Sequence, residues 1–150
     1  MRKLDHLQTM ALTYQEIVQG ERPWTAPGNF MNDWFEYAKG KRLQLVADPL
    51  VLPERLDAEN FQWATFCAAS VEWFCNRYSI PCPSWVYSPV YNLPEPWFDS
   101  PGAYKPEVRA RLIQRTPEQF TRRNIFCGNR MFANKYEVAE EYHLLLQKTS

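Results

Sequence analysis

Six arginines within residues 105–135 are the side chains best suited to recognise another molecule. They are Arg109, Arg111, Arg115, Arg122, Arg123 and Arg130. A guanidinium group is planar and always charged, and its paired N–H donors match carboxylate and phosphate oxygens. Residues 105–135 hold eight Lys and Arg against two Glu, a net charge of +6, whereas residues 1–104 carry −4 and residues 136–150 carry −2. A chain that is neutral as a whole therefore contains one strongly basic region.

Three interpretations of this basic region stay open. The arginines form a solvated face with internal ion pairs, or they anchor an acidic protein partner, because arginine beside aromatic residues is typical of interfaces. In the third interpretation they contact the phosphates of a nucleic acid. The balance of 17 basic and 17 acidic residues, and the lack of a helix-turn-helix or RNP motif, disfavour nucleic acid.

The sequence offers little for catalysis. Its two histidines, His6 and His143, stand near opposite ends, and a Cys–His or Ser–His catalyst needs one of them beside a nucleophile. The chain contains no Gly-x-Ser-x-Gly elbow, no Walker loop and no Gly-x-Gly-x-x-Gly, and it has only five glycines. Enzymatic activity is disfavoured, and the sequence predicts no catalytic residue and no cofactor.

One pattern resembles a metal site. Glu140 and His143 are three residues apart on a predicted helix, with Glu137 one turn earlier. Carboxylate-bridged di-iron bundles need such a pair twice, together with two further Glu, and no second Glu-x-x-His occurs here. The pattern is therefore interpreted as a solvated helix face, and no metal site is predicted.

The four cysteines lack the spacing of a metal site or a redox motif. They are Cys67, Cys75, Cys82 and Cys127. Residues eight apart on one helix are about 12 Å apart, too far for a disulfide, which excludes pairing of the first two. We expect buried thiols in a reducing cytoplasm. Whether the last two pair stays open.

Length and composition predict a single domain over residues 1–150. The chain is 45% hydrophobic and 15% aromatic, with 12 prolines. A chain of this length buries about 70% of its unfolded surface and folds without disulfides or metal. No apolar run reaches the roughly 18 residues of a membrane span. Asp5 and His6 stand where a signal peptide is apolar, so we expect a cytoplasmic protein that does not bind membranes.

Apolar periodicity predicts an all-α protein, a compact bundle of five to seven helices. The central helix covers residues 58–78 with Asp57 as its N-cap, because it is apolar nearly all round and must be buried on more than one side. A turn is expected at residues 21–29. The other predicted helices are 3–19, 30–39 with Asn29 as N-cap, 41–47, 106–114, a short one ending near Asn124, and 135–147.

Residues 79–105 form a different kind of segment, which we call the aromatic strap. Seven prolines between Pro81 and Pro106 exclude a regular helix. Its aromatic residues predict an extended segment that lies on the helical core, although they could instead contact a partner. Together with the six arginines, the predicted partner-binding residues are Trp85, Trp97 and Phe98.

The segment Thr116–Phe126 has the sharpest local signal. Thr116, Pro117 and Gln119 have the spacing of a capping box that starts a short helix. Phe120 is expected to point inward, Arg123 to bond carbonyls of the aromatic strap, and Asn124 to end the helix in the left-handed conformation. Ile125 and Phe126 are expected to close the core.

The order of residues from Trp63 to Phe126 resembles a family of small, poorly characterised bacterial proteins. Its pattern is Pro-x-Trp, then Trp-Phe, then Ser/Thr-Pro-x-x-Phe-x-x-Arg-Asn-Ile/Val-Phe. The matching positions are Pro83, Trp85, Trp97, Phe98, Thr116, Pro117, Phe120, Arg123, Asn124, Ile125 and Phe126. Similar segments occur free-standing, as C-terminal parts of helix-turn-helix regulators, and near nucleotidyltransferase-like genes of toxin–antitoxin type.

The resemblance implies a regulatory or antitoxin-like role and carries over no catalytic residue. This chain departs from the family in residues 1–50, which show no helix-turn-helix, and in a tail at residues 134–150. We therefore expect a non-enzymatic protein-binding module, acting through the basic region and the aromatic strap on a toxin or regulator. The alternative is a nucleic-acid-associated accessory protein whose arginines contact phosphates. The sequence leaves the partner's identity and the oligomeric state open.

Overall fold

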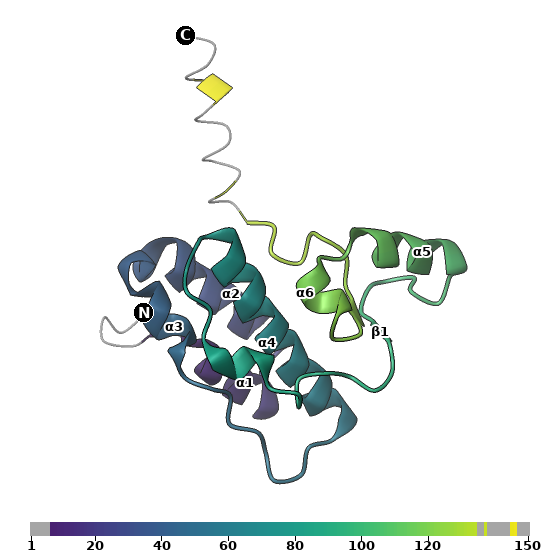
Figure 1. The fold of residues 1–150 in the computed structure, drawn as a ribbon, viewed down its shortest axis with the longest axis horizontal. Helices are drawn as coiled ribbons and strands as arrows, with labels where there is room; N and C mark the ends of the chain where they lie inside the picture. Colours follow the sequence, from purple (N-terminus) through teal and green to yellow (C-terminus); the bar gives the residue numbers. More distant parts are fainter. Residues whose placement is uncertain (1–6, 135–136, 138–144, 147–150) are drawn as a thin grey trace.

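The computed structural model describes residues 7–134, 137, 145 and 146 of the chain. The protein is mainly α-helical, as predicted (Figure 1). In the described part the α-helices are α1 (Met10–Val18), α2 (Thr25–Asn32), α3 (Arg42–Ala47), α4 (Ala58–Arg77), α5 (Pro106–Arg115) and α6 (Glu118–Thr121). The shorter elements are a π-helical turn at Asp33–Tyr37, 3₁₀ turns at Lys39–Lys41 and Ser84–Tyr87, and the strands β1 (Trp97–Phe98) and β2 (Ile125–Phe126).

Helix α4 is the central helix, which confirms the prediction. The Asp57 side chain caps it by accepting a hydrogen bond of 2.7 Å from the backbone N–H of Asn60. Twelve of its twenty residues are buried, so it is covered on more than one side. Figure 1 shows α4 running between α1 on one side and α6 on the other. Helix α5 lies farther out, at the edge of the molecule.

The core around α4 is aromatic. The rings of Phe74 and Phe132 have centroids 4.8 Å apart, and the Phe120 ring lies 5.5 Å from that of Phe66. Phe120 is fully buried, as predicted.

The four cysteines are free thiols, so Cys82 and Cys127 form no disulfide. The helices of the described residues include none with the length and apolar character needed to cross a membrane.

The N-terminal helices differ from the prediction in their bounds. Helix α1 begins at Met10 rather than at residue 3; residues 7–9 are not helical, and residues 1–6 lie outside the described part. The expected turn at residues 21–29 is shorter, because α2 already begins at Thr25 and Asn29 lies inside it. Pro27 stands in the first turn of α2, where a missing N–H breaks no intrahelical bond. The turn residues Pro27 and Gly28 were thus a misleading signal.

The predicted capping box at Thr116 is wrong. Thr116 follows the last residue of α5, and its hydroxyl accepts a hydrogen bond of 2.7 Å from the backbone N–H of Gly128. Helix α6 begins at Glu118 without a side-chain cap. The local pattern predicts that Thr116 starts a helix, but its side chain makes a tertiary contact instead. The expectations for Asn124 and Ile125 are confirmed, since Asn124 has a φ of +66° and Ile125 is fully buried. Phe126 differs from the prediction, because it is only partly buried and stacks on Phe98 instead of closing the core.

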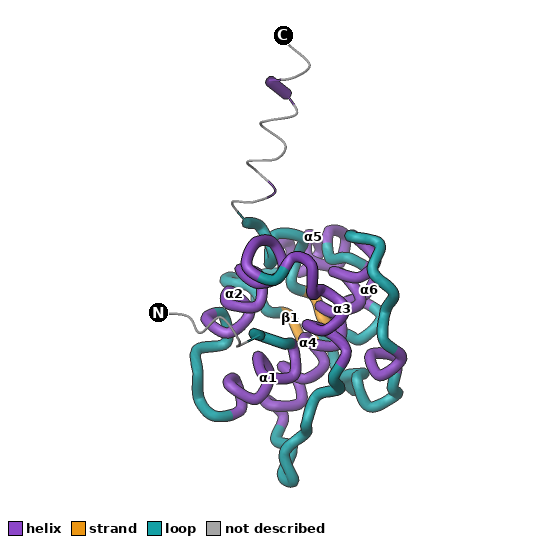
Figure 2. Tube along the Cα trace, turned by 90° about the vertical axis from the view of Figure 1, so that its left-hand side faces the viewer, coloured by secondary structure: helices purple, strands orange, loops and turns teal. Residues whose placement is uncertain are grey.

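The aromatic strap contains no α-helix, as predicted, and it is fixed along its length. Strands β1 and β2 pair in parallel, with Trp97 opposite Ile125 and Phe98 opposite Phe126. Figure 2 shows this small sheet in the middle of the molecule. Beside it, the side-chain amide of Asn124 donates a hydrogen bond of 2.8 Å to the carbonyl of Leu93. Two-residue strands have no detectable alternation, so the sequence did not predict them.

Candidate functional site

The six predicted arginines fall into two groups. We call Arg109, Arg122 and Arg123 the paired arginines, because groups of the same chain hold each guanidinium. We call Arg111, Arg115 and Arg130 the open arginines. No open arginine makes a side-chain hydrogen bond, ion pair or ring contact with another residue in the part of the chain that the structure describes.

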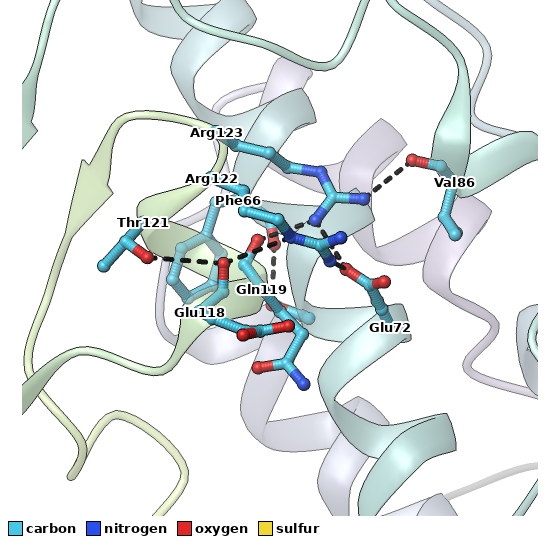
Figure 3. Close-up of polar contacts among 9 residues, drawn as sticks. Phe66, Glu72, Val86, Glu118, Gln119, Thr121, Arg122 and Arg123 are labelled. Atoms are coloured by element: carbon cyan, nitrogen blue, oxygen red, sulfur yellow. Dashed lines mark hydrogen bonds and ion pairs between the residues drawn. The ribbon is translucent and has the colours of Figure 1, made fainter.

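Arg123 is the most deeply buried of the paired arginines (Figure 3). One guanidinium nitrogen donates to Glu72 Oε1 at 2.8 Å and to the carbonyl of Gln119 at 2.6 Å. The other terminal nitrogen donates to the carbonyl of Val86 at 2.9 Å. Arg123 therefore connects α4, α6 and the aromatic strap. Its predicted hydrogen bond to a carbonyl of the strap is confirmed.

Glu72 balances the charge of this cluster. It lies on the buried surface of α4, with a side chain that is only 4% exposed, and Arg122 donates to the same oxygen as Arg123. Burial by itself raises the pKa of Glu72, but hydrogen bonds from Arg123 and Arg122 and their positive charges bring that pKa below its ordinary value. The carboxylate is therefore ionised at neutral pH, and the three side chains form a structural ion cluster.

Arg109 is held at the edge of the small sheet. Its guanidinium lies 4.7 Å from the centre of the Phe98 ring, and its Nε donates to the carbonyl of Ala103 at 2.6 Å. The Phe98 ring in turn stacks on Phe126 with centroids 4.8 Å apart. These contacts fasten α5 to β1 and β2.

The aromatic residues predicted to bind a partner also have contacts within the chain. The indole N–H of Trp85 donates to the carbonyl of Val46 at 2.9 Å, and the Trp97 ring packs edge-on against Trp63 at 5.2 Å. Phe98 lies between Arg109 and Phe126. All three are partly exposed, so their role towards a partner stays a prediction.

The open arginines surround one hollow of about 260 Å³. Arg111 and Arg115 are one helical turn apart on α5, so they lie on the same face. Arg130 comes from the loop that follows β2. All three side chains belong to exposed residues. The hollow is lined by Ser100, Pro101, Val108, Arg111, Leu112, Arg115, Cys127, Gly128, Asn129 and Arg130.

Gly128 fixes the loop against the helix. Its φ of +79° lies in the left-handed region, and a Cβ atom there would stand 3.5 Å from Leu112 Cδ2. Its N–H is bound by Thr116 at the end of α5, at 2.7 Å. The loop therefore lies against the side of α5 that carries Leu112, next to the face with Arg111 and Arg115, and all three residues line the hollow. Among the described residues, three positive side chains line the hollow and no Asp or Glu does, which makes it a candidate anion-binding site.

A second hollow, of about 340 Å³, opens beside the ion cluster. It is lined by Val86, Tyr87, Ser88, Asn92, Arg122 and Arg123. Its two arginines already share the carboxylate of Glu72, so this hollow has less unbalanced charge than the first. We therefore place the candidate site at the open arginines.

The metal-like pattern cannot be assembled from the described residues. Glu137 forms an ion pair with Arg77, at 3.0 Å between oxygen and nitrogen. Glu140 and His143, and most of the predicted helix 135–147, lie outside the described part. Among residues 7–134, 137, 145 and 146, no three His, Cys, Asp or Glu side chains are grouped as a metal ion requires.

The sequence contained part of the signal for the hollow. The spacing of Arg111 and Arg115 places them on one helix face, whereas nothing local indicates that Arg130 joins them. Comparison of the chain with protein-family models, with curated proteins and with solved structures finds no match.

Proposed function

We propose that this chain is a non-enzymatic regulatory module that binds an acidic protein partner through its open arginines. One observation carries the proposal: within the described residues, three of the six arginines are held internally, whereas Arg111, Arg115 and Arg130 surround one hollow without a partner. Charged groups that meet no counter-charge in their own chain favour an anionic surface on another molecule.

The size of the basic surface favours a protein over a nucleic acid. Proteins that bind nucleic acids through charge commonly neutralise about six to ten phosphates. The open arginines are only three, they border a compact hollow, and the chain as a whole has a net charge of zero.

The proposal gives the aromatic strap a supporting role. Its tryptophans are held by Val46 and Trp63, and Phe98 holds Arg109, so the strap keeps α5 in place. The regulatory character follows from the family resemblance, under which the partner would be a toxin or a regulator and this chain its antitoxin-like counterpart. The contact itself is assigned to α5 and the loop at residues 128–130.

Affinity capture with matched charge variants tests the proposal. The tagged full chain, the variant Arg111→Glu/Arg115→Glu and the control Arg22→Glu/Arg55→Glu are incubated with nuclease-treated lysate of the source organism. The control reverses the same number of charges at two exposed arginines away from the hollow. Quantitative mass spectrometry then measures each captured protein.

The expected result is an acidic protein in stoichiometric amount with the wild type and the control, and its loss with Arg111→Glu/Arg115→Glu. Equal capture by all three chains would contradict the proposal. In a parallel capture from lysate without nuclease, recovery of nucleic acid without a stoichiometric protein, measured by the absorbance ratio at 260 and 280 nm, would favour the nucleic-acid alternative instead.

A further inference from the structure

The hollow between α5 and the loop at residues 128–130 places three positive charges around a small volume, and none of them is paired with an acidic side chain among the described residues. A single carboxylate neutralises one of them, whereas a phosphate monoester near neutral pH carries a charge of about −1.5 to −2 and three acceptor oxygens. Arginine is the residue best suited to such a group, because its paired donors bind two phosphate oxygens at once. The charge of the hollow therefore fits a dianion better than a monoanion.

The lining of the hollow also fits a phosphate. In the part of the chain that the structure describes, it contains no acidic side chain that would repel an anion, and its volume of about 260 Å³ leaves room for a phosphoryl group among the guanidinium groups. The loop side contributes Gly128 and Asn129, and α5 contributes Arg111 and Arg115, so an anion in the hollow would touch two separate elements. An anion held between them would therefore also stabilise the folded state.

Two titratable groups lie close to this hollow. Cys127 lines it, and burial, followed by the charge of Asp99, raises the pKa of that thiol to about 12. Burial also raises the pKa of the Asp99 carboxyl above its ordinary value. The thiol stays neutral across the physiological range, and the charged groups that line the hollow are the three guanidinium groups.

We propose that the open arginines form a binding site for a phosphate monoester dianion. The proposal rests on the proposed function, because it names the chemistry of the group that the partner presents. Two sources share this chemistry: a phosphorylated side chain of the partner protein, and a small phosphate compound bound on its own. The nucleic-acid backbone is a different ligand, since each phosphodiester carries one charge.

Isothermal titration calorimetry of the full chain at constant ionic strength tests the site. The probes are the blocked peptide Ala-phosphoserine-Ala, the same peptide with Glu or unmodified Ser in place of phosphoserine, and inorganic phosphate. We expect the phosphoserine peptide to bind at least about tenfold more tightly than the Glu peptide, since the second charge and third oxygen engage a further guanidinium. Tighter binding of the peptide than of inorganic phosphate assigns the source to a partner side chain, and equal binding assigns it to a free phosphate.

Matched variants locate the binding. We expect Arg111→Gln/Arg115→Gln to weaken phosphoserine binding by at least about tenfold, and Arg22→Gln/Arg55→Gln, which removes the same charge elsewhere, to leave it unchanged. Arg130→Gln is a second test that changes no helical residue, and weaker binding is expected there too. Far-UV circular dichroism checks that each variant is folded.

The pH dependence provides an independent readout. Between about pH 7.5 and about pH 5 the phosphoserine peptide loses its second charge, so its affinity should fall, whereas sulfate stays a dianion and reports any change of the protein itself. Equal affinity for the phosphoserine and Glu peptides, or unchanged binding by both Arg111→Gln/Arg115→Gln and Arg130→Gln, would overturn the inference.

The two proposals fail separately. If the wild type binds no phosphoserine peptide but still captures an acidic protein that Arg111→Glu/Arg115→Glu loses, the phosphate inference is wrong and the proposed function stands. If the peptide binds with the expected variant pattern but no protein is captured, the site binds phosphate and the protein-binding function is wrong.

Discussion

The two groups of arginines come from the same short stretch of chain, yet they have opposite surroundings. Arg123 is buried and its guanidinium meets a carboxylate and two backbone carbonyls. Arg111, twelve residues earlier on α5, is exposed and meets no such group among the described residues. The difference is caused by Glu72, which lies on α4 about fifty positions earlier in the chain and pairs with Arg123. Local charge density therefore does not tell an arginine that is paired within the fold from one that is exposed and unpaired among the described residues.

Burial explains why Arg123 is not interchangeable with an open arginine. A buried charge is tolerated only when a counter-charge and hydrogen bonds replace its water, and Glu72 meets this need for Arg123. An exposed guanidinium keeps its water and needs no partner to be stable. Removing a member of the first group should destabilise the fold, and removing a member of the second should alter binding alone.

The largest effect is expected from the ring that supports the paired arginines. Phe120 is fully buried on α6, just before Arg122 and Arg123, and packs on Phe66 at 5.5 Å. Phe120→Ala should lower the free energy of unfolding by about 3–5 kcal/mol, because it removes a large core side chain. Urea unfolding measures the change. Tyr104→Ala, at an aromatic residue that is 78% exposed, is the control and should have little effect. A wild-type unfolding curve for Phe120→Ala would show that α6 does not depend on the core.

Neutralising the shared carboxylate breaks the paired group directly. Glu72→Gln keeps the size of the side chain but leaves the Arg123 charge buried and uncompensated, so it should cost about 3 kcal/mol of unfolding free energy. Glu107→Gln, an exposed residue in the first turn of α5, is the matched control. Chemical unfolding of both variants decides the matter. Equal midpoints for the two would mean that the ion cluster does not hold the fold.

The aromatic strap tests whether the support extends to α5. Trp97 packs edge-on against Trp63 and lies next to Phe98, which holds Arg109. Trp97→Ala should lower the unfolding free energy by about 2 kcal/mol, less than a fully buried ring because Trp97 is partly exposed. Thermal unfolding followed by circular dichroism measures it. An unchanged melting temperature together with lost partner capture would instead make Trp97 a contact residue.

Acid should weaken the paired group before it affects the open group. The folded-state pKa of Glu72 lies below the unfolded value of about 4.3, because its hydrogen bonds to arginine outweigh its burial. The stabilisation by ionised Glu72 is therefore complete above that pH and is lost as the pH falls through the lower folded pKa. Unfolding free energies measured across this acidic range should fall more steeply for the wild type than for Glu72→Gln. Parallel curves would contradict the assignment.

The smallest effect on stability is expected from the open arginines. Arg111→Gln/Arg115→Gln removes two exposed charges without partners in the described residues, so the unfolding free energy should change by no more than about 0.5 kcal/mol. Thermal unfolding in phosphate-free buffer provides the measurement. A loss well above this value would show that these arginines are held by the fold and would weaken the distinction between the groups.

Features that depend on neighbours along the chain could be predicted from the sequence. Helix α4 was visible from its nearly continuous apolar surface and its Asp57 cap, and the left-handed Asn124 was visible from its place at the end of a helix. The start of α2 was missed, because Pro27 and Gly28 favour a turn when taken alone and are tolerated early in a helix.

Features that depend on contacts between distant segments could not be predicted. Thr116 bonds Gly128 instead of starting α6, and the pairing of β1 with β2 joins residues far apart in two-residue strands without a pattern. The same limit applies to the site. An acidic residue such as Glu72 on a largely buried helix indicates that a cation lies beside it. The sequence does not show which cation this is, and only the fold brings Arg123 to Glu72 and leaves Arg111 exposed.

The most direct measurement compares two matched arginine variants, with and without the phosphoserine peptide. Arg123→Gln removes a buried, paired guanidinium, and Arg111→Gln removes an exposed, open one. The melting temperature of each is measured alone and with the peptide at a saturating concentration for the wild type. We predict that Arg123→Gln melts lower but keeps the rise caused by the peptide, and that Arg111→Gln melts like the wild type but loses much of that rise. A normal melting temperature for Arg123→Gln, or a full rise for Arg111→Gln, would contradict the division of the arginines into fold-holding and binding groups.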